Sequence, residues 1–168
     1  MPRPRPARPT SLHPVVPALA EQRPIHVLNG PNLDILGSRE PKIYGKATLK
    51  DLETLCRKAA DAAGFALVFE QSNAEHVLVE QIHRAALRAV GLIINPAAFS
   101  YSSYAIVDAL RAAELPIAEV HLSNIHARDE GWRAKSLVSP VASAVISGLG
   151  FEGYAAAIRW IAGQARGA

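Results

Sequence analysis

Short apolar runs alternate with longer segments of helical periodicity along most of the chain. Five apolar runs are bounded by glycine, proline or polar residues, as is typical of buried strands; they cover residues 25–28, 65–69, 91–95, 116–121 and 141–146. Apolar residues three or four positions apart predict helices between residues 48 and 64, around residues 78–86, over residues 100–114 and around residues 154–161. Residues 122–139 have weak periodicity, and we expect irregular structure there.

The order of these elements predicts the fold. Strand and helix alternate throughout, which favours a parallel sheet with helices on both faces and right-handed crossovers. Five strands in a chain of 168 residues favour the flavodoxin-like order 2-1-3-4-5, an α/β three-layer sandwich. We expect a single domain of this kind over residues 24–168. Residues 1–23 are rich in proline and arginine, and we expect a disordered tail there.

Local signals mark some ends of the predicted helices. Thr48 followed by Asp51 is typical of a capping box, Gly64 is a plausible helix stop, and residues 71–73 offer a cap for the next helix. Tyr154 belongs to the apolar stripe of the last helix. Cys56 lies in the apolar stripe of the first helix, so we expect a packed thiol rather than a reactive one.

Charge and cysteine content narrow the function classes. The net charge is +3, but four of the 18 basic residues and one of the 15 acidic residues lie in residues 1–23, so the rest is formally neutral. This balance does not indicate a nucleic-acid partner. The single cysteine excludes an internal disulfide and suits a reducing cytoplasm. No run of roughly 18 apolar residues occurs, so we expect no membrane span.

Polar side chains follow three neighbouring strands of the predicted sheet. Asn32 comes after the first strand, Asn95 ends the third, and Glu119 and His121 lie at the end of the fourth. Because the carboxyl ends of parallel strands share one edge of the sheet, we expect these groups to form a ligand site there. A long polar loop over residues 29–45 leaves the first strand at the same edge, and loops of this length are usually functional or disordered.

The chemistry available at this edge favours proton transfer. No glycine-rich phosphate loop follows any strand, and no metal-ligand spacing or activated serine or cysteine is evident. A tyrosine acts as a base only if its anion is stabilised, and Arg39 lies five residues before Tyr44 on the long loop. An asparagine side chain such as that of Asn32 can hold an enolate oxygen or a water beside it.

Several sequence blocks together point to one family. They are Asn29-Gly30-Pro31-Asn32-Leu33, Leu36-Gly37-Ser38-Arg39-Glu40-Pro41, Tyr44-Gly45, Gln71-Ser72-Asn73, Ile94-Asn95-Pro96, Glu119-Val120-His121-Leu122-Ser123-Asn124 and Val145-Ile146-Ser147-Gly148-Leu149-Gly150. In this order and spacing they resemble the type II 3-dehydroquinate dehydratases, over nearly the whole of the part expected to fold. The fold of that family is the flavodoxin-like one expected above.

The resemblance implies the reaction and the groups that carry it. Water is eliminated in anti fashion from 3-dehydroquinate, giving 3-dehydroshikimate through an enolate in the shikimate pathway of aromatic amino-acid biosynthesis. Neither a metal nor an organic cofactor is used. Tyr44 is implied as the base, with Arg39 lowering its pKa, and Asn32 positions a water that holds the enolate. His121 is implied as the acid that protonates the departing hydroxyl, oriented by Glu119.

The resemblance also implies substrate contacts and an assembly. The substrate-binding positions are Asn95, Tyr101, Leu122 and Ser123 through their backbone, and Arg133. Asp108 reaches the site of a neighbouring subunit, because the family assembles as a homododecamer, a tetramer of trimers. We therefore expect a cytoplasmic, oligomeric lyase with a small-molecule substrate and no nucleic-acid or membrane partner.

Four positions depart from the family pattern. Tyr101 stands where the family has a substrate-binding histidine, Ala98 stands where a glycine or a small residue is common, and Val107 stands where an arginine is usual. Gly131 looks like a one-residue insertion, so the assignment of Arg133 assumes that the gap lies there. The alternatives left open are a normal enzyme with an adjusted pocket, a weaker enzyme or one that serves quinate breakdown, and a paralogue that binds a related ligand without turnover.

Overall fold

The structure is a computed structural model that describes residues 23–38, 46–127 and 131–167. The tail expected over residues 1–23 lies outside the described part apart from Arg23, and so do Arg39 and Tyr44. Arg23 Nη2 donates a hydrogen bond of 2.7 Å to the Leu87 carbonyl oxygen, which ties the start of the described chain to the end of a helix.

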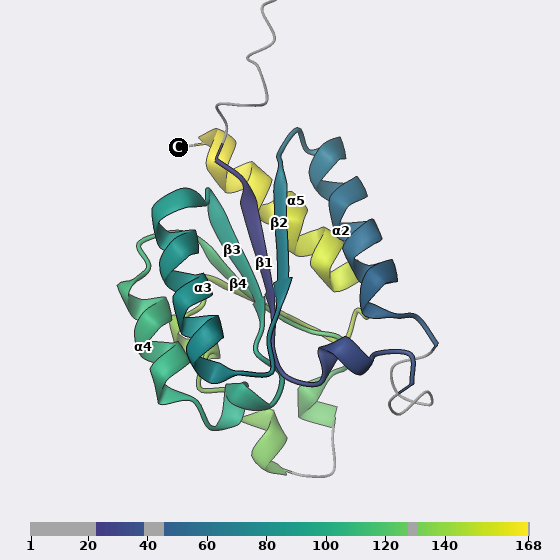
Figure 1. Cartoon of the computed structure of the whole chain (residues 1–168), viewed down its shortest axis with the longest axis vertical. Coiled ribbons are helices and arrows are strands. Elements are labelled where there is room, and N and C mark those ends of the chain that lie inside the picture. The colour runs from purple at the N-terminus through teal and green to yellow at the C-terminus, as the bar shows by residue number, and fades with distance from the viewer. Residues whose placement is uncertain (1–22, 39–45, 128–130, 168) are drawn as a thin grey trace, which may run out of the picture.

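A five-stranded parallel sheet forms the centre of the molecule (Figure 1). Its strands are β1 (Ile25–Asn29), β2 (Leu67–Gln71), β3 (Gly91–Asn95), β4 (Ile117–His121) and β5 (Ala144–Ser147), in the order β2-β1-β3-β4-β5. All four strand pairs are parallel, so the predicted topology is confirmed. Every residue of β1, β3 and β4 is buried, because helices cover both faces of these central strands.

Four α-helices complete the two outer layers (Figure 1). On one face, α2 (Leu49–Ala62) packs beside α5 (Glu152–Gly167), and on the other α3 (Glu75–Arg88) packs beside α4 (Tyr104–Ala112). Each face has its own apolar core: Ile25 and Val27 of β1 lie in the core under α2 and α5, whereas Leu28 lies in the core under α3 and α4. Alternate residues of the strand thus serve opposite layers.

The start of α2 is as predicted. The Thr48 hydroxyl accepts from the Asp51 backbone N–H at 3.2 Å, and the Thr48 N–H donates to the Asp51 carboxylate at 2.9 Å, which completes a capping box. Cys56 in the same helix is fully buried, and burial raises its pKa to about 12. The thiol is therefore a packing group, as expected.

Three boundaries differ from the sequence expectation. The last strand begins at Ala144 rather than at Val141, because Val141 belongs to a 3-10 turn that precedes it. The helix expected over residues 100–114 is divided into a 3-10 turn, η2 (Ala97–Tyr101), and α4, because Ser103 caps α4 by accepting from the Ile106 N–H at 2.9 Å. The second strand begins two residues later than expected, since Phe65 closes the turn after α2 with a hydrogen bond from its N–H to the Ala60 carbonyl oxygen.

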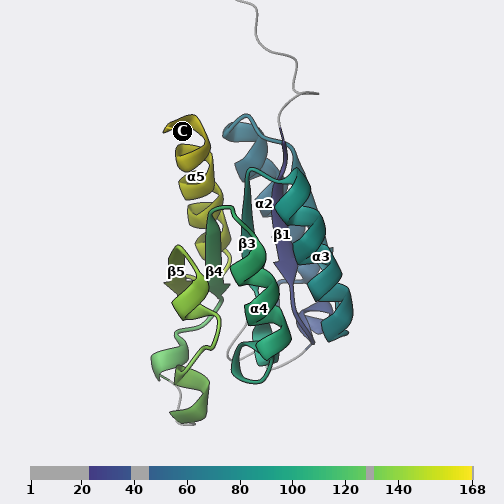
Figure 2. The same cartoon turned by 90° about the vertical axis from the view of Figure 1, so that its left-hand side faces the viewer.

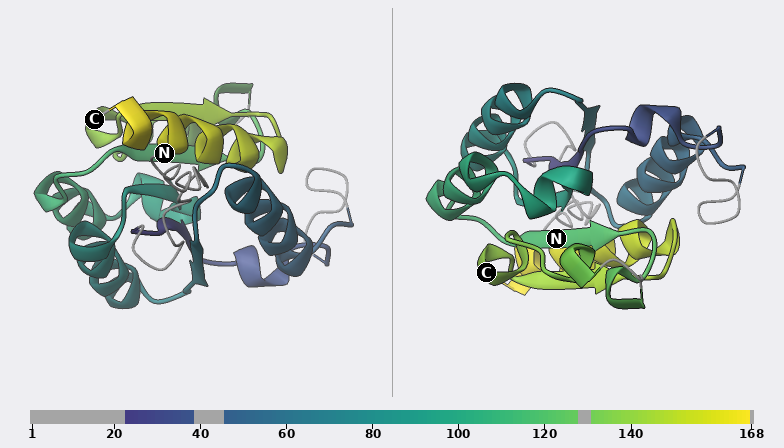
Figure 3. Two further views of the ribbon diagram at one scale, coloured as in Figure 1. Left: turned by 90° about the horizontal axis from the view of Figure 1, so that it is seen from above. Right: turned by 90° about the horizontal axis from the view of Figure 1, so that it is seen from below.

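The segment after β4 contains three further 3-10 turns within its described residues: η3 (Ile125–Ala127), η4 (Gly131–Ala134) and η5 (Ser139–Val141). The irregular structure expected over residues 122–139 is confirmed in this form. The turns η3 and η4 lie with η2 beyond the carboxyl ends of the strands (Figure 2), the edge onto which the right-hand view of Figure 3 looks, whereas η5 packs beside α4. Among the described residues, no helix has the length and apolar character needed to cross a membrane.

Candidate active site

A cleft of about 120 Å³ opens at the carboxyl edge of the sheet. Its walls come from the loop after β1, from η2, from the end of β4 and the segment that follows it, and from η4. The lining residues are Pro31, Asn32, Leu33, Leu36, Asn95, Ala97, Ala98, Tyr101, His121, Leu122, Ser123, Ile125 and Trp132. The structure thus brings together six of the positions singled out in the sequence: Asn32, Asn95, Tyr101, His121, Leu122 and Ser123.

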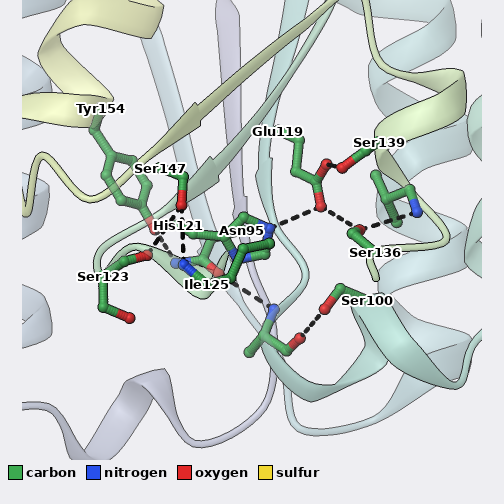
Figure 4. A network of polar contacts seen from close by, with 12 residues as sticks. Asn95, Ser100, Glu119, His121, Ser123, Ile125, Ser136, Ser139, Ser147 and Tyr154 are labelled. Atoms are coloured by element: carbon green, nitrogen blue, oxygen red, sulfur yellow. Dashed lines mark hydrogen bonds and ion pairs between the residues drawn. The ribbon is translucent and has the colours of Figure 1, made fainter. Parts of the chain in front are cut away.

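Glu119 and His121 form a buried pair at the end of β4 (Figure 4). Because successive side chains of a strand point to opposite faces, residues two apart lie on the same face. His121 Nε2 lies 2.8 Å from Glu119 Oε1, and the Glu119 side chain is fully buried. His121 is 5% exposed and lines the cleft, whereas Glu119 lies behind it. The carboxylate is therefore placed to orient the imidazole rather than to touch a ligand.

Two serines complete the surroundings of the Glu119 carboxylate. Ser136 Oγ donates to Oε1 at 2.5 Å, and Ser139 Oγ donates to Oε2. Burial opposes ionisation of Glu119, but the hydrogen bonds from His121, Ser136 and Ser139 outweigh it, so the pKa of this carboxyl lies below its usual value. The sequence analysis did not single out either serine.

A second buried network lies beneath the cleft and joins both ends of the described chain. Tyr154 Oη donates to Asn29 Oδ1 at 2.8 Å and accepts from Asn95 Nδ2 at 2.9 Å. Asn29 Nδ2 in turn donates to the Glu70 carbonyl oxygen at 3.0 Å. Tyr154 is completely buried, and burial raises its pKa, so the phenol remains a proton donor. Periodicity placed Tyr154 in an apolar stripe and missed this role for its hydroxyl.

Asn95 is held from two sides by this network. Its Nδ2 donates to Tyr154, and its Oδ1 accepts from the Ala97 N–H at 3.2 Å. Ala97 has a φ of +49°, in the left-handed region that non-glycine residues rarely adopt. The amide is therefore fixed in orientation where it lines the cleft, which favours recognition of a polar ligand group.

Asn73 supports the loop that carries Asn32. Its Oδ1 accepts from the Asn32 N–H at 2.8 Å and from Gln71 Nε2 at 3.0 Å, and its Nδ2 donates to Asp34 at 2.9 Å. These contacts accompany the left-handed conformation of Asn32, whose φ is +65°. The expectation that residues 71–73 cap α3 is wrong, because Ala74 is the N-cap and makes no side-chain capping bond. The segment supports the cleft instead.

Hydrogen bonds from the end of β5 fix the backbone that lines the cleft after β4. The Gly148 N–H donates to the His121 carbonyl oxygen at 3.1 Å, and the Gly150 N–H donates to that of Leu122 at 2.9 Å. Ser147 Oγ donates to the Ser123 carbonyl oxygen at 3.1 Å. The backbone N–H groups of this segment, which these bonds do not use, are thereby held in one conformation at the cleft.

An aromatic pair forms one wall of the cleft. Tyr101 and Trp132 meet edge to face, with ring centroids 5.0 Å apart and an interplanar angle of 84°. Trp132 belongs to η4, the turn that also contains Arg133 and begins at Gly131. Val107 is buried in the core between α3, α4 and the sheet, so its change from the family pattern does not alter the lining of the cleft.

Some expected site residues are not part of the cleft as described. Asp108 is exposed on α4 and does not line the cleft of its own chain. Arg39 and Tyr44 lie outside the described residues, so their roles stay predictions. Within the described residues, no three His, Cys, Asp or Glu side chains are grouped as ligands for a metal ion.

The comparisons with known proteins agree with one another. The profile of a family described as Dehydroquinase class II matches residues 23–162. A protein named 3-dehydroquinate dehydratase 2 from Agrobacterium fabrum is 54% identical over 133 residues, which cover 79% of this chain and 90% of that protein. A protein named 3-dehydroquinate dehydratase from Streptomyces avermitilis is 54% identical over 143 residues, 84% of this chain and 89% of that protein.

A solved structure gives the same result. The crystal structure of a type II dehydroquinase from Propionibacterium acnes superimposes with a TM-score of 0.81 at 43% sequence identity, and it covers 84% of this chain and 97% of its own. The match extends over all the strands and helices that form the cleft, since the family profile begins before β1 and ends within α5. The chain therefore belongs to the class II dehydroquinase family.

Proposed function

We propose that this protein is the lyase that converts 3-dehydroquinate into 3-dehydroshikimate and water in the shikimate pathway. The family match and the names of relatives about half identical to it support this reaction. The observation that carries the proposal within the structure is the Glu119–His121 pair, held at 2.8 Å where His121 lines the cleft. A carboxylate behind a histidine is an arrangement suited to general acid catalysis.

The proposed mechanism divides the proton transfers between two groups. The Tyr44 phenolate, stabilised by Arg39, takes a proton from the carbon beside the substrate ketone, and the electron pair moves onto the carbonyl oxygen to form an enolate. Asn32 holds the water that stabilises this oxygen. When the enolate collapses, the carbon–oxygen bond to the hydroxyl on the opposite face breaks, and the imidazolium of His121 supplies the proton that makes the leaving group water.

The proposed substrate contacts follow the lining of the cleft. Asn95 and the backbone of Leu122 and Ser123 are placed to bind the substrate hydroxyls, and Tyr101 offers a phenol where the family has a histidine. We assign the substrate carboxylate to Arg133, next to Trp132 of the cleft wall. No metal or organic cofactor takes part in the proposed steps.

The test is formation of the conjugated enone of 3-dehydroshikimate, followed by its ultraviolet absorbance. Purified protein should produce this signal from 3-dehydroquinate, and both Tyr44→Phe and His121→Asn should lower kcat by at least about a thousandfold. Leu87→Gln is the control, because Leu87 is 77% exposed near the end of α3 and lies outside the cleft. A folded protein that raises its thermal midpoint with 3-dehydroquinate but never consumes it would instead be a ligand-binding paralogue.

The proposed assembly is a homododecamer, a tetramer of trimers, in which Asp108 reaches the cleft of a neighbouring subunit. This is supported by the exposure of Asp108 and Tyr104 on α4, away from the cleft of their own chain. Sedimentation should give twelve times the 18.0 kDa of one chain. Co-expression of Asp108→Asn and His121→Asn chains should restore activity that neither has alone, because mixed sites then hold one intact copy of each residue.

The remaining expectations concern the tail and the location. We propose that residues 1–23 are a disordered extension of the domain over residues 24–168, to be tested by removing them: activity and thermal midpoint should stay unchanged. We propose a cytoplasmic location, which the single cysteine supports, since the chain can form no internal disulfide. The family match and the named relatives favour the shikimate pathway over quinate breakdown.

A further inference from the structure

The carboxylate of Glu119 receives three hydrogen bonds from its surroundings (Figure 4). His121 Nε2 and Ser136 Oγ both bond to Oε1, at 2.8 Å and 2.5 Å, and Ser139 Oγ bonds to Oε2. If Glu119 were protonated, its own O–H would have to donate to one of these three groups, and that group would then be an acceptor. The two hydroxyl groups and the imidazole can all donate to these oxygens, so the geometry fits an ionised Glu119, in agreement with the lowered pKa of this carboxyl.

The Ser136 hydroxyl has a second partner in its own segment. A serine hydroxyl has a single proton, and the Val138 N–H donates to Ser136 Oγ at 3.1 Å, which uses an acceptor position of that oxygen. An ionised carboxylate can only accept, so with Glu119 ionised the Ser136 proton is directed to it. The same argument places a proton on His121 Nε2. Since Nε2 is used by Glu119 and His121 lines the cleft, the other ring nitrogen, Nδ1, is the one available to a ligand there.

The segment that carries both serines is anchored independently of Glu119. Val138, between them, is fully buried in the core under α3 and α4. The Leu137 N–H donates to the Ser100 carbonyl oxygen at 2.7 Å, which joins the segment to η2 and hence to the cleft wall that contains Tyr101. The two hydroxyl groups are therefore held in place by packing and backbone contacts, so their hydrogen bonds to Glu119 cost little further ordering.

We propose that Ser136 and Ser139 are positioning residues for proton transfer: their hydroxyl groups keep the Glu119 carboxylate ionised and directed at His121 Nε2, so that Nδ1 gives the proton to the departing hydroxyl. This inference rests on the proposed function. Neither serine touches the substrate, and both act through Glu119. Among the described residues, His121 is the titratable group whose charge acts on Glu119. The serines therefore affect the charges of one pair, Glu119 and His121.

The test compares Ser136→Ala, Ser139→Ala and the double variant with wild type. Loss of a hydrogen bond to a charged acceptor should lower kcat roughly tenfold for each single variant and about a hundredfold for the double variant, with KM within about threefold. Without the serine hydroxyls the Glu119 carboxylate stabilises the His121 imidazolium less. The pH above which kcat falls should therefore be lower than in wild type. Ser136→Thr and Ser139→Thr retain the hydroxyl and should recover most of the loss.

Ser143→Ala is the matched control. Ser143 Oγ accepts from the Ile117 N–H at 3.3 Å just before β5, at the edge of the sheet opposite the cleft, so a hydroxyl is lost without contact to Glu119. Its kcat and pH profile should equal those of wild type. If the double variant does not fold, Ser136→Cys and Ser139→Cys carry the test, because a thiol keeps the shape but is a weak donor.

The outcomes separate this inference from the proposed function. If wild type is active and the folded alanine variants have the same kcat and pH profile, the positioning role is overturned. It is also overturned if the threonine variants lose as much activity as the alanine variants. A wild type that forms no enone overturns the proposed function. The role of the serines is then decided by nuclear magnetic resonance of ¹⁵N-labelled histidine: the Nε2 proton signal that His121→Asn removes should shift in the alanine variants and not in Ser143→Ala.

Discussion

Gly30 lies against Pro96 so closely that a Cβ atom added to Gly30 would be 2.4 Å from the Pro96 carbonyl oxygen. The Gly30 N–H also donates to the Asn95 carbonyl oxygen at 2.8 Å, one step beyond the paired ends of β1 and β3. The loop after β1 and the turn into η2 thus touch backbone to backbone, which brings the Asn32 and Asn95 sides of the cleft together.

Gly30→Ala should therefore destabilise the protein by on the order of 2 kcal/mol, because backbone must move to admit the methyl group. It should also lower kcat/KM, since both sides of the cleft shift. Gly163→Ala is the control: Gly163 lies in α5 with nothing within 4 Å of an added Cβ, so alanine there should stabilise the helix by about 0.5–1 kcal/mol. Urea unfolding of both variants measures the difference, and equal midpoints would contradict the prediction.

Tyr154→Phe should leave two buried polar groups, Asn29 Oδ1 and Asn95 Nδ2, without the phenol that now joins them. An unpaired buried group costs about 1–3 kcal/mol, so the free energy of unfolding should fall by about 2 kcal/mol or more. KM should rise several-fold as the Asn95 amide loses its fixed orientation. Denaturant unfolding and steady-state kinetics check the two effects; an unchanged KM would show that Asn95 does not depend on Tyr154.

Glu119 should contribute to acid unfolding. Its pKa in the folded protein is lowered from 4.5, so its stabilising effect is complete above the unfolded value and is lost as pH falls through the folded one. Glu119→Gln should be less stable than wild type at pH 7, and the gap between their thermal midpoints should narrow below about pH 4.5. Asp51 and Glu53 also have lowered pKa values, but they remain in both proteins and cancel in the comparison. Parallel curves down to pH 3 would contradict the assignment.

Tyr101→Ala should open the cleft wall and raise KM roughly tenfold, because the edge-to-face contact with Trp132 is worth about 0.5–1.5 kcal/mol and the wall also loses its phenol. Trp132 fluorescence should shift to longer wavelength as the ring gains water contact. Tyr101→Phe retains the ring pair and serves as the control for packing, so any rise of KM in this variant measures the hydroxyl alone. Wild-type KM in both variants would exclude this wall from substrate binding.

The sheet order and the convergence of strand-end residues were predictable from the sequence. Both follow from periodicity along the chain and from the fixed handedness of parallel crossovers, which place Asn95 and His121 at one edge without further information. The start of β2 was displaced by two residues, because Phe65 is as apolar as a strand residue but is used in the turn after α2.

The supporting contacts of the cleft were not predictable in the same way. Periodicity assigns Tyr154 to a face of α5 but does not say that its hydroxyl reaches Asn29 and Asn95. Ser136 and Ser139 lie in a segment with weak periodicity, so only the folded chain shows that both reach Glu119. Contacts of this kind depend on tertiary packing between segments distant in sequence.

The hydrogen bond between Tyr154 and Asn29 spans 125 positions and joins the first strand to the last helix. During synthesis on the ribosome, β1 emerges long before its polar partner exists, and the catalytic pocket stays unfinished until α5 has left the exit tunnel and docked. Premature termination between residues 147 and 154 would thus give a chain with all five strands but without the floor of the pocket, so the pocket of each chain is completed only when its last helix has been made.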